Sequence, residues 1–211
     1  MRPRRHVLLL GPPGTGKTAT AGAIAQALGL PFFVARLESI IDSYLGHTGR
    51  NLREVFDAVR TVPGVYLLDE FDAIGSSRES KGRTDVAEMR RALNTLLTFM
   101  EEDGEGMIVA ATNLTAILDT AMFRRFELVL EYRLPTPDDA EILVRRTLER
   151  AGLAPDKAID WPQVRAATAG LSHDNIVKAT MSAARTCVLD GERTVRHRPL
   201  VAKLEMVRNA G

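Results

Sequence analysis

The chain has 211 residues, of which 45% are hydrophobic and 26% charged, and its formal net charge is +1. This composition is typical of a soluble globular protein with one large or two modest domains. No apolar run reaches the roughly eighteen residues of a membrane-spanning helix, and the one near the N-terminus is too short for a signal peptide. Residues 1–133 hold 16 Lys and Arg against 17 Asp and Glu, and residues 134–211 hold 12 against 10. Neither part has the basic excess expected of a nucleic-acid-binding surface.

The first elements of the chain frame a glycine-rich turn. The apolar run 7–10 predicts a buried strand, residues 19–28 predict a helix, and Gly11-Pro12-Pro13-Gly14-Thr15-Gly16-Lys17-Thr18 lies between them. This is the P-loop pattern G-x-x-x-x-G-K-[S/T], whose backbone N–H groups and helix N-terminus bind phosphate. We expect Lys17 to reach the β- and γ-phosphates and Thr18 to ligate Mg²⁺. The expected nucleotide contacts are Pro13, Gly14, Thr15, Gly16, Lys17, Thr18 and Ala19. The alternative is a glycine-rich turn that binds nothing.

Strands and helices alternate through the rest of residues 1–133. The predicted strands are 31–35, 65–68, 107–111 and 126–130, and the predicted helices are 48–61 and 86–100. Such alternation indicates a three-layer α/β domain with a parallel sheet. Ligands of these sheets gather at the carboxyl ends of the strands.

Three polar residues follow the predicted strands at that edge. Asp69 and Glu70 end the run 65–68, 52 residues after Lys17, and Asn113 follows 107–111. Asp69 would hold Mg²⁺ beside Thr18, and Glu70 would orient and polarise an attacking water, which favours a hydrolase over a small-molecule kinase. Asn113 could reach the γ-phosphate or that water. The alternatives are a solvated acidic turn and an Asx turn.

Residues 134–211 have a different character. Helices are predicted at about 137–151, 161–168, 172–188 and 199–209, with Ser172 as the cap of the third. We read this part as a small helical domain. Arg193, Arg196, His197 and Arg198 are interpreted as a solvated loop. Cys187 is the only cysteine, so no internal disulfide can form; this fits a cytoplasmic protein, and we expect a buried side chain on a helix.

Arg124 and Arg125 lie shortly before the last predicted strand of the sheet. They could pair with acids of their own chain, or they could supply positive charge to a phosphate bound by a neighbouring subunit. The residues alone do not choose between these roles.

Taken together, these motifs resemble the AAA+ ATPases, in particular the AAA branch that remodels proteins. The matching segments are 11–18 (Walker A), 66–70 (Walker B), 111–113 (sensor 1), 118–127, the pore-loop-like 43–53 and the sensor-2-like 170–176. The adjacent Arg124, Arg125 and Phe126 look like the meiotic-clade and related bacterial members.

The resemblance implies ATP and Mg²⁺ as ligands and a ring oligomer, usually a hexamer, with ATP at each subunit boundary. It makes Arg124 and Arg125 arginine fingers that act on the neighbouring subunit. It places Tyr44 and Leu45 in the pore that grips a polypeptide substrate, makes 75–85 a second pore loop, and puts His173 near the nucleotide. The resemblance does not say which protease or adaptor protein would be the partner.

The chain departs from the family pattern at two places. It has Gly46-His47-Thr48-Gly49-Arg50 in the pore-loop segment and Ser172-His173-Asp174-Asn175 at the sensor 2 helix. It also starts about ten residues before the P-loop, so we expect a trimmed module or a minimal protein. The function that we predict is ATP hydrolysis that drives protein remodelling. The alternatives are a DNA-associated loader or initiator and a nucleotide switch that does not hydrolyse.

Overall fold

The computed structural model describes residues 5–37, 40, 48–71, 95–96, 98–100, 104–113 and 123–210, without the side chains of 48 and 49. By their contacts, the residues form two compact units. The first comprises Met1–Gly11 and Lys17–Tyr132, and the second comprises Pro12–Gly16 and Arg133–Gly211. Most of the helix predicted over 86–100 lies outside the described residues, and its described positions are helical.

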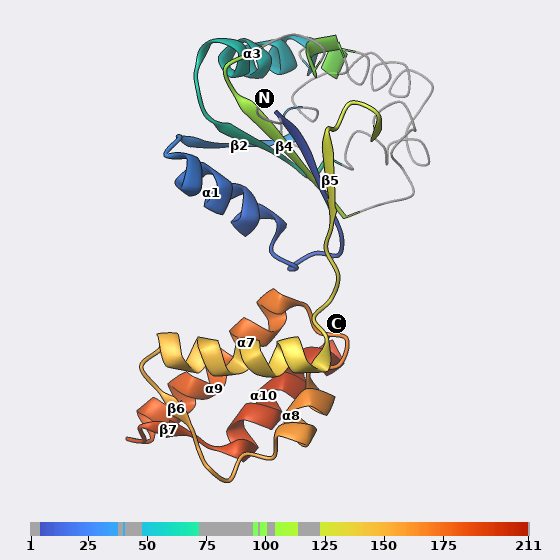
Figure 1. Cartoon of the computed structure of the whole chain (residues 1–211). Coiled ribbons are helices and arrows are strands. Elements are labelled where there is room, and N and C mark those ends of the chain that lie inside the picture. The colour runs from blue at the N-terminus through green and yellow to red at the C-terminus, as the bar shows by residue number, and fades with distance from the viewer. Residues whose placement is uncertain are drawn as a thin grey trace. The chain divides into compact units, whose positions relative to one another are not determined.

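The first unit contains a five-stranded parallel sheet (Figure 1). Its strands are β1 (His6–Leu10), β2 (Phe32–Arg36), β3 (Val65–Asp69), β4 (Met107–Thr112) and β5 (Leu128–Glu131), in the order β2-β3-β4-β1-β5. The register pairs Leu10 with Thr112 and Arg36 with Asp69, so the carboxyl ends of four strands share one edge. The predicted α/β class with a parallel sheet is confirmed.

Alternating side chains of the central strands build two cores, one on each face of the sheet. On one face, Leu8 and Leu68 pack with Leu52 and Phe56 of α3 (Thr48–Thr61). On the other face, Leu9 and Leu67 pack with Ala21 and Ala25 of α1 (Lys17–Leu28). Strands that are covered on both faces are apolar at nearly every position, and the runs of the central strands have this composition. Figure 1 shows α1 and α3 on opposite faces.

The second unit is helical. It contains α7 (Pro137–Arg150), α8 (Trp161–Ala167), α9 (His173–Leu189) and α10 (His197–Ala210). The four predicted helices are confirmed. Their buried faces form one core, to which Val144, Leu148, Ile176, Ala183, Cys187, Leu200 and Leu204 contribute. Cys187 is fully buried on α9, as predicted.

Side chains cap three of these helices, and at α8 the Asp160 carboxylate accepts the Gln163 N–H at 3.2 Å. Thr136 caps α7 in a capping box, in which its hydroxyl accepts the Asp139 N–H (3.2 Å) and the Asp139 carboxylate accepts the Thr136 N–H (3.2 Å). Ser172 caps α9 by accepting the Asn175 N–H at 3.3 Å, as predicted.

The solvated loop predicted around Arg193 is only partly right: Arg193, Arg196 and Arg198 are exposed, but the segment also contains regular structure. Two short parallel strands, β6 (Ala154–Pro155) and β7 (Thr194–Val195), were not predicted, and α10 begins directly after them at His197. Val195 is fully buried and holds this segment in the core. Arg196 pairs with Glu192 at 2.8 Å and with Asp190 at 3.6 Å, so it is tied to the end of α9.

Candidate functional site

The glycine-rich turn connects β1 to α1, and its backbone conformation depends on glycine. Gly11 has φ +144° and Gly16 has φ +102°, values that other residues rarely adopt. A Cβ at Gly11 would lie 2.3 Å from the Tyr132 carbonyl oxygen, so a side chain has no room there. A Cβ at Gly16 would meet nothing within 4 Å, so open space lies beside this glycine. Glycine therefore serves two purposes: close packing at the start of the turn and an open face at its end.

Lys17 is the first residue of α1, and it links the turn to the end of β4. Its ammonium donates to the Gly11 carbonyl at 2.7 Å and to the Asn113 side-chain oxygen at 2.8 Å. Lys17 is only 8% exposed. The pairing of Leu10 with Thr112 places the start of the turn beside Asn113, which explains how residues 96 positions apart meet. The structure thus brings together two of the predicted site residues.

Thr18 and Asp69 also come together. The Thr18 hydroxyl lies 3.4 Å from an Asp69 carboxylate oxygen. A hydroxyl and a carboxylate are the hard oxygen ligands that Mg²⁺ prefers, so this pair fits the metal that the sequence pattern implies. Both residues border a cleft of about 670 Å³ at the ends of β2 and β3. This volume lies in the range of small-molecule sites.

Arg36 borders the same cleft and was not predicted. It is the last residue of β2, and its register partner is Asp69. The sequence gives one signal for it, a charged residue at the carboxyl end of an otherwise apolar strand.

Glu70 has an unusual backbone. Its φ is +56°, and it is the only non-glycine residue with positive φ in the described part of the chain. The Glu70 N–H donates to the Asp69 carboxylate at 3.0 Å, and the next N–H, that of Phe71, donates to Ala111 of β4 at 2.9 Å. Non-glycine residues held in this conformation are concentrated at functional sites. The two hydrogen bonds hold the turn that carries the exposed Glu70 side chain.

Arg124 and Arg125 form an exposed turn just before Phe126. Phe126 is buried and packs edge to face on Phe71, with 5.9 Å between ring centroids. The arginine turn is therefore anchored in the core beside the residue that follows Glu70.

His173 opens α9 in the second unit. Its Nδ1 is buried and has no hydrogen-bond partner in the described part of the chain. The next residue, Asp174, donates its N–H to the Gly14 carbonyl at 3.0 Å. Tyr44, Leu45 and the proposed second pore loop at 75–85 lie outside the described residues.

A glycine-rich turn of the P-loop pattern between β1 and α1, with polar residues at the ends of β3 and β4, defines a P-loop domain of α/β class. The family "ATPase family associated with various cellular activities (AAA)" matches residues 7–134. The chain therefore belongs to the AAA family, and the resemblance seen in the sequence is confirmed at this level.

Curated relatives agree with this assignment. The chain is 35% identical over 94% of its length to "Uncharacterized AAA family ATPase y4kL" of Sinorhizobium fredii, of which it covers 58%. It is 30% identical over 99% of its length to "Proteasome-activating nucleotidase" of Methanoregula boonei, and it covers 49% of that protein. It is 36% identical over 90% of its length to "ATP-dependent zinc metalloprotease FtsH" of Acidothermus cellulolyticus, and it covers 29% of that protein. The chain thus spans less than two thirds of the length of each of these relatives. Where the structure describes the chain, none of its helices has the length and apolar composition needed to cross a membrane.

Proposed function

We propose that this chain binds and hydrolyses ATP. The contact between Lys17 and Asn113 is the observation that carries the proposal, because it unites the phosphate-binding turn with the end of the adjacent strand. In this arrangement Lys17 would contact the β- and γ-phosphates, and the backbone N–H groups of 14–19 would bind the remaining phosphate oxygens. Positioning and charge stabilisation provide most of the catalysis of phosphoryl transfer, and both are functions of such a turn.

Mg²⁺ would be held by the Thr18 hydroxyl and the Asp69 carboxylate and would neutralise phosphate charge. Glu70 would act as the group that orients the attacking water and accepts its proton. Asn113 would act on the same water or on the γ-phosphate, and Lys17 keeps its amide in place. His173 would approach the nucleotide from the start of α9.

We further propose that the chain works in a ring in which Arg124 and Arg125 act on ATP of the neighbouring subunit. Their exposure on a turn anchored by Phe126 supports this, because a residue that acts across a boundary must be both accessible and fixed. The energy of hydrolysis would move or unfold protein, with Tyr44 and Leu45 as the residues that grip the polypeptide. Relatives named as a proteasome-activating nucleotidase and as an ATP-dependent protease favour protein as the substrate.

The test is phosphate release by the full chain with ATP and Mg²⁺, compared with Lys17→Ala. Release by the parent that is lost in the variant is expected; equal release would contradict the proposal. For the remodelling step, Tyr44→Ala should retain basal hydrolysis but fail to unfold a destabilised fluorescent test protein that the parent unfolds. Unfolding at the parent's rate by Tyr44→Ala would exclude the role of Tyr44.

A further inference from the structure

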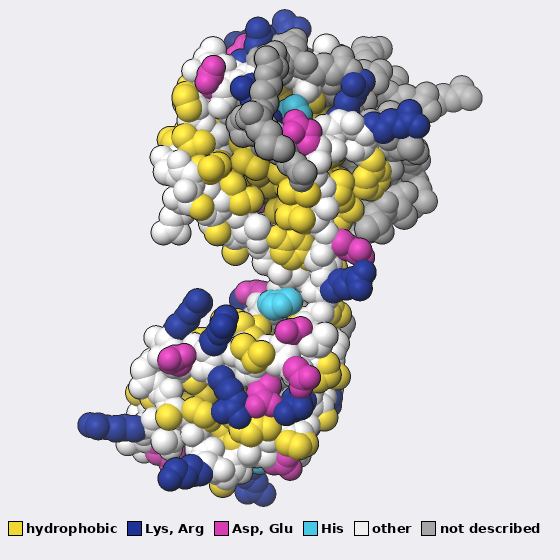
Figure 2. Space-filling model, in the orientation of Figure 1, with side chains coloured by type: hydrophobic (Ala, Val, Ile, Leu, Met, Phe, Trp, Pro, Cys, Tyr) yellow, Lys and Arg dark blue, Asp and Glu magenta, His cyan; other side chains and the backbone are white. Residues whose placement is uncertain are grey.

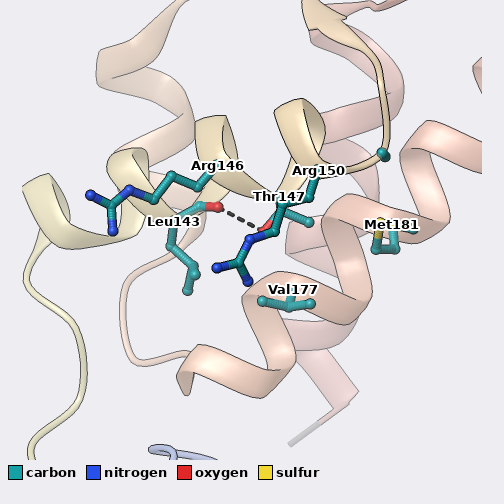
Figure 3. Close-up of a pocket in the computed structure, with 7 residues that line it drawn as sticks. Leu143, Arg146, Thr147, Arg150, Val177 and Met181 are labelled. Carbon is teal, nitrogen blue, oxygen red and sulfur yellow. Dashed lines mark hydrogen bonds between the residues drawn. The ribbon is translucent and has the colours of Figure 1, made fainter. Parts of the chain in front are cut away.

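A second pocket lies within the helical unit and contains none of the residues discussed above as site residues. It has a volume of about 310 Å³ and lies between α7 and α9 (Figure 3). Leu143 of α7 and Val177 and Met181 of α9 provide its apolar lining. Figure 3 shows Leu143 and Arg150 reaching from α7 toward Val177. The Thr147 hydroxyl donates to the Leu143 carbonyl at 2.7 Å, so its proton is used within α7 and the floor of the pocket is apolar in character.

Two arginines border this apolar floor. Arg146 and Arg150 lie one helical turn apart, and both line the pocket, which contains no acidic residue. Within the described part of the chain, neither guanidinium has an ion-pair or hydrogen-bond partner. Arg145, their neighbour on α7, differs clearly, because it pairs with Glu141 at 2.8 Å and lies 3.7 Å from the centre of the Trp161 ring.

Three acidic groups of α7 and α9 are already engaged, whereas Glu149 of α7 forms no ion pair in the described part of the chain. Glu141 pairs with both Arg145 and Arg165, Asp138 pairs with Arg165, and Asp174 of α9 pairs with Lys178 at 2.6 Å. The positive charge beside the pocket is thus not neutralised by these groups.

We infer that this pocket binds an acidic peptide segment that inserts a leucine-like side chain between α7 and α9 and places carboxylates on Arg146 and Arg150. Charge complementarity selects this occupant: guanidinium groups form paired hydrogen bonds with carboxylates, and the apolar floor requires an apolar anchor. The volume suits one or two aliphatic side chains better than a folded domain surface. This site does not depend on the proposed ATPase activity, and it would give the chain a means of recruiting a partner or substrate that carries such a segment.

The probe is the fluorescein-labelled peptide Gly-Ser-Glu-Asp-Leu-Leu-Asp-Glu-Gly-Ser, titrated with the full chain at low salt without nucleotide. We expect a dissociation constant on the order of tens of micromolar, as is common for short segments. The same peptide with all carboxylates changed to amides, and the same peptide with serines in place of leucines, should each bind at least about fivefold more weakly, because one loses the charge pairs and the other loses the buried apolar area.

The protein variants test the site from the other side. Arg146→Gln with Arg150→Gln should weaken binding roughly fivefold or more, and Met181→Gln about threefold. Arg193→Gln with Arg198→Gln makes the same charge change at exposed positions outside the pocket and should leave binding unchanged. Arg146→Glu with Arg150→Glu should instead prefer a peptide with lysines in place of the acids, which keeps the test decisive if one variant folds poorly.

Five outcomes would overturn the inference, and the first four are measured by binding. The first is no binding of the acidic leucine peptide at about 1 mM, and the second is an amide peptide that binds as tightly as the acidic one. The third is a control with Arg193→Gln and Arg198→Gln that loses as much affinity as the variant with Arg146→Gln and Arg150→Gln. The fourth is a single-stranded oligonucleotide that displaces the labelled peptide better than the unlabelled peptide does. This fourth outcome would indicate a nucleic-acid surface. The fifth outcome is a variant with Arg146→Gln and Arg150→Gln that sediments differently from the parent but binds the peptide equally well. This result would indicate a contact between copies of the chain and would equally overturn the inference.

Discussion

Phe71 and Phe126 pack edge to face in the core of the sheet domain, with ring centroids 5.9 Å apart and an interplanar angle of 78°. Phe71 directly follows Glu70, and Phe126 directly follows Arg125. One aromatic contact therefore joins the backbones that carry two groups of candidate catalytic residues. Aromatic pairs of this kind are worth about 0.5–1.5 kcal/mol beyond their buried area.

This contact predicts that Phe126→Leu lowers the kcat for ATP hydrolysis about fivefold to tenfold and changes the KM for ATP less than twofold. The reason is that small displacements of positioned groups reduce rates strongly while the phosphate-binding turn is untouched. Phe56→Leu is the matched control, because Phe56 is also buried and stacks on Phe99 at 5.0 Å in the same core. Equal losses of kcat in both variants would mean that the effect comes from general destabilisation.

The double engagement of Lys17 predicts that Lys17→Ala abolishes ATP binding. The variant removes the ammonium that lies at the turn and also releases Asn113 from its 2.8 Å contact. Isothermal titration calorimetry with ATP and Mg²⁺ measures this directly, and Lys203→Ala on α10 is a control for loss of one lysine. Asn113→Ala should retain most of the affinity yet hydrolyse slowly, and affinity for ATP unchanged in Lys17→Ala would contradict the phosphate role.

The positive φ of Glu70 predicts a difference between two neutral amides at this position. Glu70→Gln and Glu70→Asn both remove the charge that would polarise water, so both should bind ATP but hydrolyse it very slowly. Asn tolerates the left-handed conformation better than Gln, so Glu70→Asn should be more stable by about 0.5 kcal/mol. Denaturant unfolding and phosphate release measure the two effects. Hydrolysis by Glu70→Gln within about twofold of the parent would remove Glu70 from the catalytic role.

Much of the sheet and of the helical unit could be predicted from periodicity and caps, because apolar runs such as 65–68 and caps such as Ser172 act locally. The glycine-rich turn and the position of Asp69 at a strand end could be predicted for the same reason, since each pattern is fixed within a few residues; their chemical roles stay predictions. The Lys17 contact with Asn113 and the Phe71 contact with Phe126 depend on strand order, which no local pattern gives. The strand β7 was missed because two residues carry no periodicity, and its position depends on burial of Val195.

The capping box of α7 predicts a pH dependence of the helical unit. Hydrogen bonds from the Thr136 side chain, and then from its backbone, hold the pKa of Asp139 below its usual value, and His173 adds to this. Because the pKa is lower in the folded state, the stabilisation is present above the unfolded pKa of about 3.9 and is lost as the pH falls through the folded pKa. The urea midpoint of the parent should therefore exceed that of Asp139→Asn at pH 6, and the gap should shrink at pH 3. In a Thr136→Val background, the gap should be smaller at both pH values; a gap that is independent of pH in the parent would contradict this account.

The exposed turn at Arg124 and Arg125 predicts complementation between inactive subunits. Loss of both arginines should reduce hydrolysis on the order of 10³–10⁵ with ATP binding retained, whereas a surface ion pair would be worth about 1 kcal/mol or less. The decisive measurement mixes subunits that carry both Arg124→Ala and Arg125→Ala with subunits that carry Lys17→Ala; each kind of subunit is inactive alone. If the arginines act across the subunit boundary, mixed rings regain part of the activity, because some intact phosphate-binding turns then face intact arginines. A mixture of Lys17→Ala with a subunit carrying all three substitutions is the control and should stay inactive, since it contains no intact turn. Co-assembly shown by native mass spectrometry without any recovery of hydrolysis would mean that the arginines serve their own subunit.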